Sequence, residues 1–362
     1  MANTDDKPAL KITLEDLANV NLPQTGQVSP PVAQAPGAVR QYGNISTPVA
    51  EPAVVNEGKS NIFLQGWFYL GTAGLVGALI GWGIGEPFFS DRSEQTPSDL
   101  LLKLIIIPLV LIFLCLGFSI AESIVERSPS KAAQRALLSL PLGLVLSVAF
   151  MMAGGMVYTV GREICAALGI DPRNPASYRN PALWVARSLA WMVFAAAAGI
   201  VYGLVDRSLR KGRYGVLGAI IGGGVGGLLF DPISIATSRG GPSRAIGFAL
   251  IGVATGVAIG IVESALKDRW LYVASGPLAG KQFILYKPVT VVGSSQQCDI
   301  YLFKDTSVQP QHASIELRGA QTFLHAQGQV YVSGQPVKHR ALQSGDLVQI
   351  GRYAFHFRER HR

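Results

Sequence analysis

The sequence predicts a multidomain membrane protein, an all-α bundle of six transmembrane helices followed by an all-β sandwich domain. The 362 residues are 49% hydrophobic and only 15% charged, whereas soluble domains carry about a quarter charged residues. The charge deficit lies between about 61 and 267, where apolar runs recur at the length of about 20 residues that a bilayer core requires. From Trp270 onward the pattern changes to short alternating strands separated by turns, which is typical of a β sandwich.

Residues 1–60 are expected to form a disordered cytoplasmic tail. They are polar and contain Pro30, Pro31, Pro36, Pro48 and Pro52 among small residues. Such a composition buries too little apolar surface to offset the entropy lost on ordering.

Six spans are predicted in residues 61–267, at about 64–84, 102–122, 138–160, 183–205, 214–235 and 245–266. Basic residues concentrate in the loops after the second and fourth spans, which hold Arg127, Lys131, Arg135, Arg207, Arg210, Lys211 and Arg213. Cytoplasmic loops carry the excess of Lys and Arg. We therefore expect a multi-pass membrane protein with both termini in the cytoplasm.

The spans contain an internal repeat. The even-numbered spans align on their terminal carboxylates, Glu122, Asp206 and Glu263, and GLVGALIGWGIG from Gly74 resembles GVLGAIIGGGVG from Gly215. This pattern predicts three helical hairpins derived from one ancestral hairpin.

Glycines are expected to form close helix contacts, because helix association in lipid depends on backbone approach and van der Waals packing. Packing within one chain is the favoured interpretation, and a homo-oligomer seam or a narrow pore is the alternative. The predicted packing residues are Gly74, Gly77, Gly81, Gly199, Gly203, Gly215, Gly218, Gly222, Gly256 and Gly260.

The middle of each predicted span lacks Asp, Glu, Lys, Arg and His. Ion-coupled carriers normally place ionisable residues there, so coupled transport is disfavoured. At the helix ends we expect Asp91 to pair with Lys103, and Asp231 with Arg244.

The C-terminal residues 270–362 carry a set of short motifs in a characteristic order. They are Ser275–Gly276, Val292–Gly293, Cys298–Asp299–Ile300, His312–Ala313, Tyr331–Val332–Ser333–Gly334, Gly345–Asp346 and Ile350–Gly351. In order and spacing these motifs, over about 270–358, resemble the forkhead-associated (FHA) family. The resemblance implies a β sandwich whose loops bind phosphothreonine peptides, and it places the peptide-binding loops at Ser294, Ser295, Gln309, Gln311, His312, Gly328 and Ser333.

The mapped phosphate-binding positions lack cations. Ser294 stands where the resemblance places a phosphate-contacting arginine, Gln309 where it places a serine, and Gly328 where it places an asparagine. A phosphate dianion is best held by a bidentate guanidinium and charge-assisted donors. Docking of an unmodified protein is therefore favoured, with phosphothreonine recognition as the alternative if Lys304 or Arg340 supplies a cation. By the same resemblance, His312 braces the loop.

Other chemistry finds no support in the sequence. Cys115, Cys165 and Cys298 share no metal-type spacing with the five histidines. There is no GxxxxGK[ST], HExxH or nucleophile-elbow motif. We expect no cofactor, no metal and no enzyme activity. The net charge of +8 is assigned to membrane anchoring rather than to nucleic acid.

The whole architecture, including the glycine-rich hairpins, resembles bacterial membrane proteins that carry such a domain, which implies a bacterial inner membrane. The leading hypothesis is a membrane-anchored adaptor or scaffold that recruits a cytoplasmic protein partner through its FHA-like domain, with a phosphothreonine-containing partner as the alternative. The second is a small channel or permease that this domain regulates. The third is a structural ring component of an envelope machine.

Overall fold

The computed structural model describes residues 40–42, 45–47, 61–88, 105–172, 174–237 and 240–360. Pro52–Arg362 form one compact unit and Met1–Glu51 another. In the latter, β1 (Arg40–Tyr42) and β2 (Ile45–Thr47) pair antiparallel. The remainder of the predicted disordered tail lies outside the described residues.

Within the described residues, six helices are long and apolar enough to cross a membrane. They are α2 (Gly66–Gly85), α4 (Ile106–Val125), α5 (Pro129–Ala167), α6 (Pro181–Val205), α7 (Leu209–Ala236) and α8 (Gly241–Leu266). Short 3-10 turns at Ile62–Leu64, Glu86–Phe88 and Pro175–Arg179 flank them. The largest difference from the predicted spans is in α5, which begins nine residues before 138. Its first turns carry Ser130, Lys131, Gln134 and Arg135, which are helical but not apolar.

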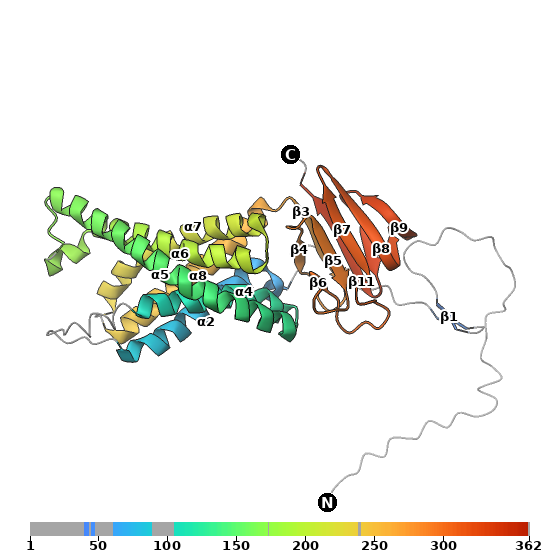
Figure 1. Ribbon diagram of the computed structural model, residues 1–362, viewed down its shortest axis with the longest axis horizontal. Coiled ribbons are helices and arrows are strands. Elements are labelled where there is room, and N and C mark those ends of the chain that lie inside the picture. The colour runs from blue at the N-terminus through green and yellow to red at the C-terminus, as the bar shows by residue number, and fades with distance from the viewer. Residues whose placement is uncertain are drawn as a thin grey trace, which may run out of the picture. The chain divides into compact units, whose positions relative to one another are not determined.

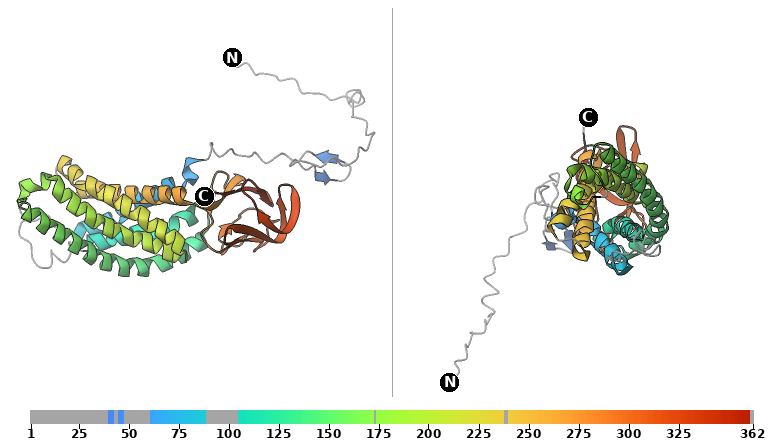
Figure 2. Two further views of the ribbon diagram at one scale, coloured as in Figure 1. Left: turned by 90° about the horizontal axis from the view of Figure 1, so that it is seen from above. Right: turned by 90° about the vertical axis from the view of Figure 1, so that its left-hand side faces the viewer.

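The helices form a closed ring. Each packs against the next in the order α2, α4, α5, α6, α7, α8, and α8 closes onto α2, as the end-on view in Figure 2 shows. The centre is filled by buried apolar side chains, including Leu70, Phe118, Trp191 and Ile251. Trp191 contacts the rings of three phenylalanines, Phe194, Phe230 and Phe248.

All ten predicted packing glycines lie against a neighbouring helix. Gly74 faces the backbone of Gly252, Gly199 faces Gly215, and Gly256 faces Leu70. Each added Cβ would meet backbone atoms of the partner helix, so glycine is what permits this approach.

The three carboxylates on which the repeat is aligned, Glu122, Asp206 and Glu263, do not occupy equivalent positions in their helices. Glu126 and Asp206 are the C-cap residues of α4 and α6, and Lys267 is that of α8. Glu122 and Glu263 therefore lie about one turn before their caps, whereas Asp206 is a cap itself. Tyr202 is the residue of α6 that corresponds in position to Glu122 and Glu263.

The ion pairs at the opposite helix ends also differ from expectation. Asp231 pairs with Arg187, and Arg244 pairs with Glu86 at 2.5 Å. The expected partners Asp91 and Lys103 lie outside the described residues.

The C-terminal β domain (Figure 1) has nine strands. They are β3 (Arg269–Ser275), β4 (Gln282–Ile284), β5 (Val289–Gly293), β6 (Ile300–Tyr301), β7 (Ala313–Arg318), β8 (Gln321–Val332), β9 (Gln335–Leu342), β10 (Leu347–Ile350) and β11 (Tyr353–Glu359). The pairing order is β4-β3-β11-β10-β8-β7-β5-β6, and β9 pairs with β8.

Strand β8 turns this sheet into a two-layered sandwich. Its first half pairs with β7 and its second half with β10, with a register irregularity between His325 and Val330. The two halves enclose one apolar core that includes Val273, Leu302, Leu324 and Phe357. In the sequence, β8 consists of two separate alternating runs, TFLHA and QVYVSG, whereas the QPVKHRAL sequence of β9 is too polar to show a core-facing alternation.

Candidate functional site

His312 connects most of the predicted peptide-binding residues. Its ring is buried, 2% exposed; Nδ1 accepts a hydrogen bond from the Gln309 N–H at 3.0 Å, and Nε2 lies 3.0 Å from the Gln329 carbonyl. A ring whose Nδ1 accepts carries its proton on Nε2, which then donates to Gln329. His312 thus braces two loops from inside, the role that the resemblance implies for it.

The backbone draws the other residues to the same place. The Ser294 and Ser295 N–H groups donate to the carbonyls of Gln309 and Pro310 at 2.9 and 3.2 Å, and the Gly328 N–H donates to the His312 carbonyl at 2.9 Å. The Cys298 thiol donates to the Pro310 carbonyl at 3.0 Å, and burial raises the pKa of this thiol.

The packing around Gly328 leaves no room for the asparagine that the resemblance places at this position. A Cβ built on Gly328 would collide with the imidazole ring of His312. The backbone approaches the ring so closely that any side chain at 328 would have to displace it.

Ser333 lies apart from this group. It occupies the β8–β9 turn with φ 49°, and its hydroxyl donates to Asp346 at 3.2 Å. Residues 329–332 of β8 separate it from Gly328, a distance of up to about 16 Å at 3.3 Å per residue. Arg340 is at the same remote end, 3.8 Å from Asp346. Two expectations are therefore corrected. Ser333 does not lie with the other predicted loop residues, and Arg340 does not lie near the predicted phosphate position.

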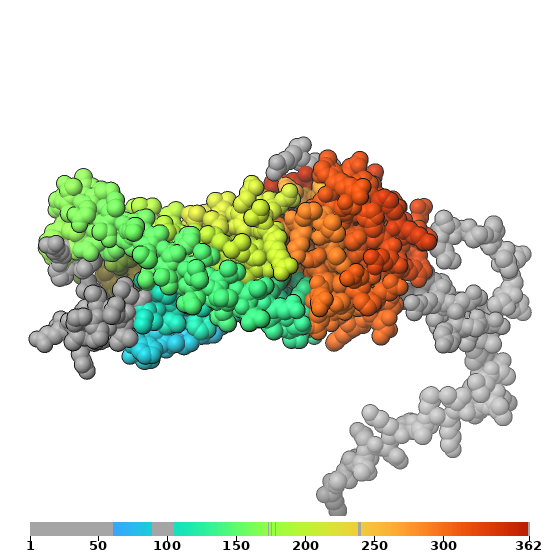
Figure 3. Space-filling view, viewed as in Figure 1, coloured from blue at the N-terminus to red at the C-terminus, as the bar shows by residue number. Residues whose placement is uncertain are grey.

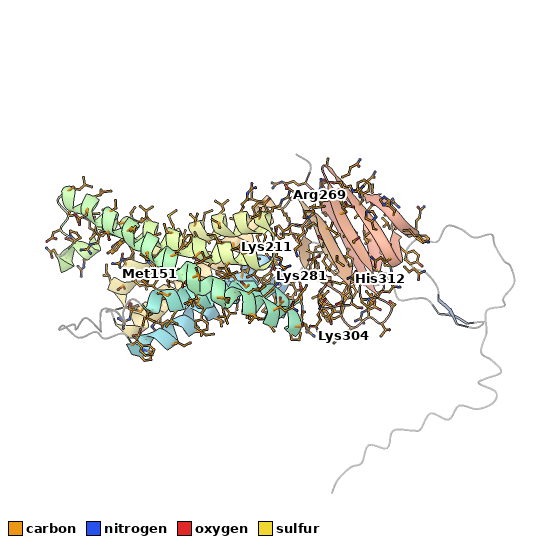
Figure 4. All side chains as sticks on the ribbon, in the orientation of Figure 1. Met151, Lys211, Arg269, Lys281, Lys304 and His312 are labelled. Carbon is orange, nitrogen blue, oxygen red and sulfur yellow. The ribbon has the colours of Figure 1, made fainter. Side chains whose placement is uncertain are left out.

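The accessible surface around His312 is rich in amides. Gln309, Gln311, Gln327 and Gln329 are exposed, as is the backbone-strained Lys304 with φ 60°. Figure 4 labels His312 and Lys304 in the β domain. This amide edge, defined as these four glutamines, offers neutral donors and acceptors in equal measure.

The loop 303–309 next to the amide edge is fixed from behind. Asp305 accepts hydrogen bonds from the Ser307 hydroxyl at 2.6 Å and from the Arg352 N–H at 2.8 Å. Burial favours a higher pKa for Asp305, but these hydrogen bonds outweigh it and hold that pKa below its ordinary value. Tyr353 donates to the Phe303 carbonyl at 2.6 Å, and burial raises the pKa of its phenol to about 12.

The loop 294–299, which would hold phosphate by the resemblance, contacts the helices. The side-chain oxygen of Gln296 accepts from the Ser130 N–H at 3.1 Å at the start of α5. Lys131 donates to the Asp299 carbonyl at 2.9 Å. These contacts hold Gln296 and Asp299 against the helices, whereas Ser294 and Ser295 are half-buried and the amide edge is exposed.

A buried ion pair joins the β domain to the helices. Lys281 lies 2.7 Å from Glu126, with side chains 1% and 2% exposed, and Lys131 lies 3.2 Å from the same carboxylate. Figure 3 shows the surfaces of the helices and of the β domain meeting directly. Only Lys267 and Asp268 separate α8 from β3.

A second buried charge cluster lies at the same helix ends. Lys211 pairs with Glu122 at 2.9 Å and with Asp206, and Arg135 pairs with Asp206 at 2.6 Å. The Tyr202 hydroxyl donates to Glu263 at 3.3 Å. A cavity of about 400 Å³ between helices and β domain is lined by residues of both, including Lys211 and Lys287. Figure 4 labels Lys211 and Lys281 at this junction.

From the sequence, these charges orient the spans and align the internal repeat, but their mutual contacts are not predicted. A detectable signal was present, since Glu126–Arg127–Ser128 and Asp206–Arg207–Ser208 are each followed by a lysine at 131 and 211. Within the described residues, no group of three or more His, Cys, Asp or Glu is arranged to hold a metal ion, and all three cysteines are free and buried.

Comparison with known proteins identifies the β domain. A family model described as the cytoplasmic domain of an inner membrane component of the type III secretion system matches residues 272–361. Over 90 residues, 24% of this chain, the sequence is 37% identical to the glycogen accumulation regulator GarA of Mycolicibacterium smegmatis. The β domain has the FHA fold. The oxoglutarate dehydrogenase inhibitor of Corynebacterium efficiens is 33% identical over the same length.

These relatives match the FHA domain and not the helices. The chain spans 56% of the length of the first relative and 63% of the second. Among solved structures, the FHA domain of the Chlamydia trachomatis protein CT664 is 25% identical, covers 26% of this chain and all of its own, and has a TM-score of 0.25. The N-terminal FHA domain of S. cerevisiae Rad53, solved with a phosphothreonine peptide, is 15% identical, covers 26% of this chain and 94% of its own, and has a TM-score of 0.24.

Proposed function

We propose that this protein is a membrane-anchored adaptor or scaffold, without enzyme activity or cofactor, whose FHA domain binds a protein partner on the cytoplasmic side of a bacterial inner membrane. Six apolar helices of spanning length support the anchoring, and the description of the matching family model supports the inner membrane. The FHA fold supports a role in protein recognition.

The observation that carries the proposal is the absence of a guanidinium from the amide edge, which presents Gln309, Gln311, Gln327 and Gln329. The exposed Lys304 beside it is a point charge that cannot hold a phosphate by a bidentate pair. Amides hydrogen-bond well to peptide groups, whereas a phosphate dianion calls for charge-assisted donors. The partner is therefore an unmodified segment of protein.

The experiment compares matched peptide libraries that differ only in phosphorylation of one threonine. Full-length protein in lipid nanodiscs should enrich the same sequences from both libraries. A matched variant, Ser294→Arg, introduces a guanidinium where the resemblance places the phosphate-contacting arginine. We expect this variant, unlike the wild type, to favour the phosphorylated library.

The orientation is tested by labelling. The native cysteines are buried, so an added cysteine dominates reaction with a membrane-impermeant maleimide. Ile170→Cys should react only from outside the cell, and Arg213→Cys only from the cytoplasm. Labelling of position 170 from the cytoplasm would refute the proposed topology.

The centre of the helix ring is filled by buried apolar side chains, which weighs against the channel or permease alternative. The matching family model favours the third hypothesis, a structural component of an envelope machine. The two remaining roles are separated by mass measurement of the nanodisc-embedded protein, since a ring component requires a homo-oligomer and an adaptor does not.

A further inference from the structure

Two turns of the helical part share one sequence pattern and one geometry. The turns Glu126–Lys131 and Asp206–Lys211 both read acid, Arg, Ser, two variable residues, Lys. Arg127 and Arg207 both have positive φ, 54° and 52°. In each turn the lysine pairs with the acid five residues earlier. The serines then start α5 and α7.

The two turns differ in how the following helix is capped. In the second turn, the Ser208 hydroxyl accepts from the Lys211 N–H at 3.2 Å, which is an ordinary N-cap. Ser128 makes no such cap on α5. Instead, Gln296 of the FHA domain accepts from the Ser130 N–H at 3.1 Å, and the Ser128 hydroxyl turns toward the same oxygen at 3.5 Å.

Three further contacts hold the FHA domain to this first turn. Lys281 pairs with buried Glu126, Lys131 donates to the Asp299 carbonyl, and the Arg127 guanidinium lies 5.9 Å from the centre of the Phe303 ring. The second turn has weaker counterparts: Arg210 lies 3.8 Å from Asp268 with its side chain 46% exposed, and Lys211 Nζ lies 5.8 Å from the centre of the Tyr286 ring. The loop 294–299 is thus fitted to one of two similar turns.

We infer that loop 294–299 is a docking surface for an unmodified helix N-terminus and that α5 of the same chain occupies it. A partner that binds this loop must therefore first release the FHA domain from the helices. The last step rests on the proposed function, whereas the docking itself does not. On release Ser128 can cap α5 as Ser208 caps α7, which offsets the loss of the Gln296 contact.

The docking is tested by the distance between spin labels at Arg213 in α7 and Gln335 in β9, in full-length protein in nanodiscs. Gln296→Lys points a cation at the positive end of α5 and at Lys131, so the distance distribution should broaden. Gln296→Glu should keep it narrow, because a carboxylate suits a helix N-terminus. Gln321→Lys, at the exposed first residue of β8, is the matched control and should match the wild type.

A second variant changes only the helix. Ser130→Pro removes the N–H that Gln296 accepts, and proline is tolerated in the first helical turn. It should broaden the distance distribution while leaving the FHA domain intact. An unchanged distribution in both Gln296→Lys and Ser130→Pro, or equal broadening in Gln321→Lys, would overturn the inference.

Competition is tested with a synthetic peptide that copies residues 126–145. Ser130→Pro should bind this peptide about tenfold more tightly than the wild type, since apparent affinity scales with the fraction of free sites. Equal weak binding by both proteins would overturn the competition step. The proposed function fails in a different experiment, if the peptide libraries show phosphate-dependent enrichment. That result would not change the distances between the spin labels.

Discussion

At the scale of single residues, the charges at the junction matter most where they are buried and shared. The Lys211 side chain is 4% exposed and serves both Glu122 and Asp206. Replacing the whole cluster by apolar residues would change the stability little. Removing the lysine alone is costly, because it leaves buried carboxylates without a partner.

Lys211→Met should therefore lower the free energy of unfolding by about 3–5 kcal/mol. Arg210→Met, one residue away, removes only a half-exposed pair and should cost less than about 1 kcal/mol. Unfolding in mixed micelles measures both. Equal losses for the two variants would mean that the Lys211 cluster is hydrated rather than buried.

The stability that Asp305 gives to loop 303–309, behind the amide edge, should be lost in acid. The pKa of Asp305 is lower in the native protein than in the unfolded chain, so its stabilising contribution is complete above the unfolded pKa of about 3.9 and is lost as the pH falls through the native pKa. The wild type should lose thermal stability below about pH 4 more steeply than Asp305→Asn. Parallel melting curves against pH for the two proteins would exclude this role.

At the scale of elements, helices and glycine contacts are predicted because each has a local sequence pattern, whereas elements without such a pattern are missed. The apolar lengths place all six helices, yet α5 extends into residues such as Lys131 that hydropathy assigns to a loop. The edge strand β9 escapes detection because Lys338 and His339 face solvent. The glycines are found because their spacing along each helix is itself the signal.

Helix α2 offers a matched test of glycine packing. A side chain at Gly77 would meet the Phe113 carbonyl at 2.5 Å, whereas at Gly83 nothing lies within 4 Å. Gly77→Leu should force α2 away from α4 and lower the melting temperature strongly. Gly83→Leu, on the open face of the same helix, should leave it within a few degrees of the wild type, and similar melting temperatures would show that these helices do not pack through Gly77.

At the scale of the whole molecule, composition alone separates the helical part from the β domain, and motif order alone suggests the FHA fold. The junction between them could not be predicted, because it joins residues far apart in the chain: Glu126 with Lys281, and Ser130 with Gln296. No local pattern marks Gln296 as a helix cap. The neutral phosphate position at Ser294 could be predicted, whereas the remote position of Ser333 required the strand register.

The most direct test of the account is the ratio of two dissociation constants, measured by calorimetry on full-length protein in nanodiscs. The peptide is the best binder from the unmodified library, and the second measurement uses the same peptide phosphorylated on threonine. The neutral amide edge predicts a ratio near one. Phosphorylated peptide binding more than about tenfold tighter, a difference of about 1.4 kcal/mol, would contradict the account and restore phosphothreonine recognition.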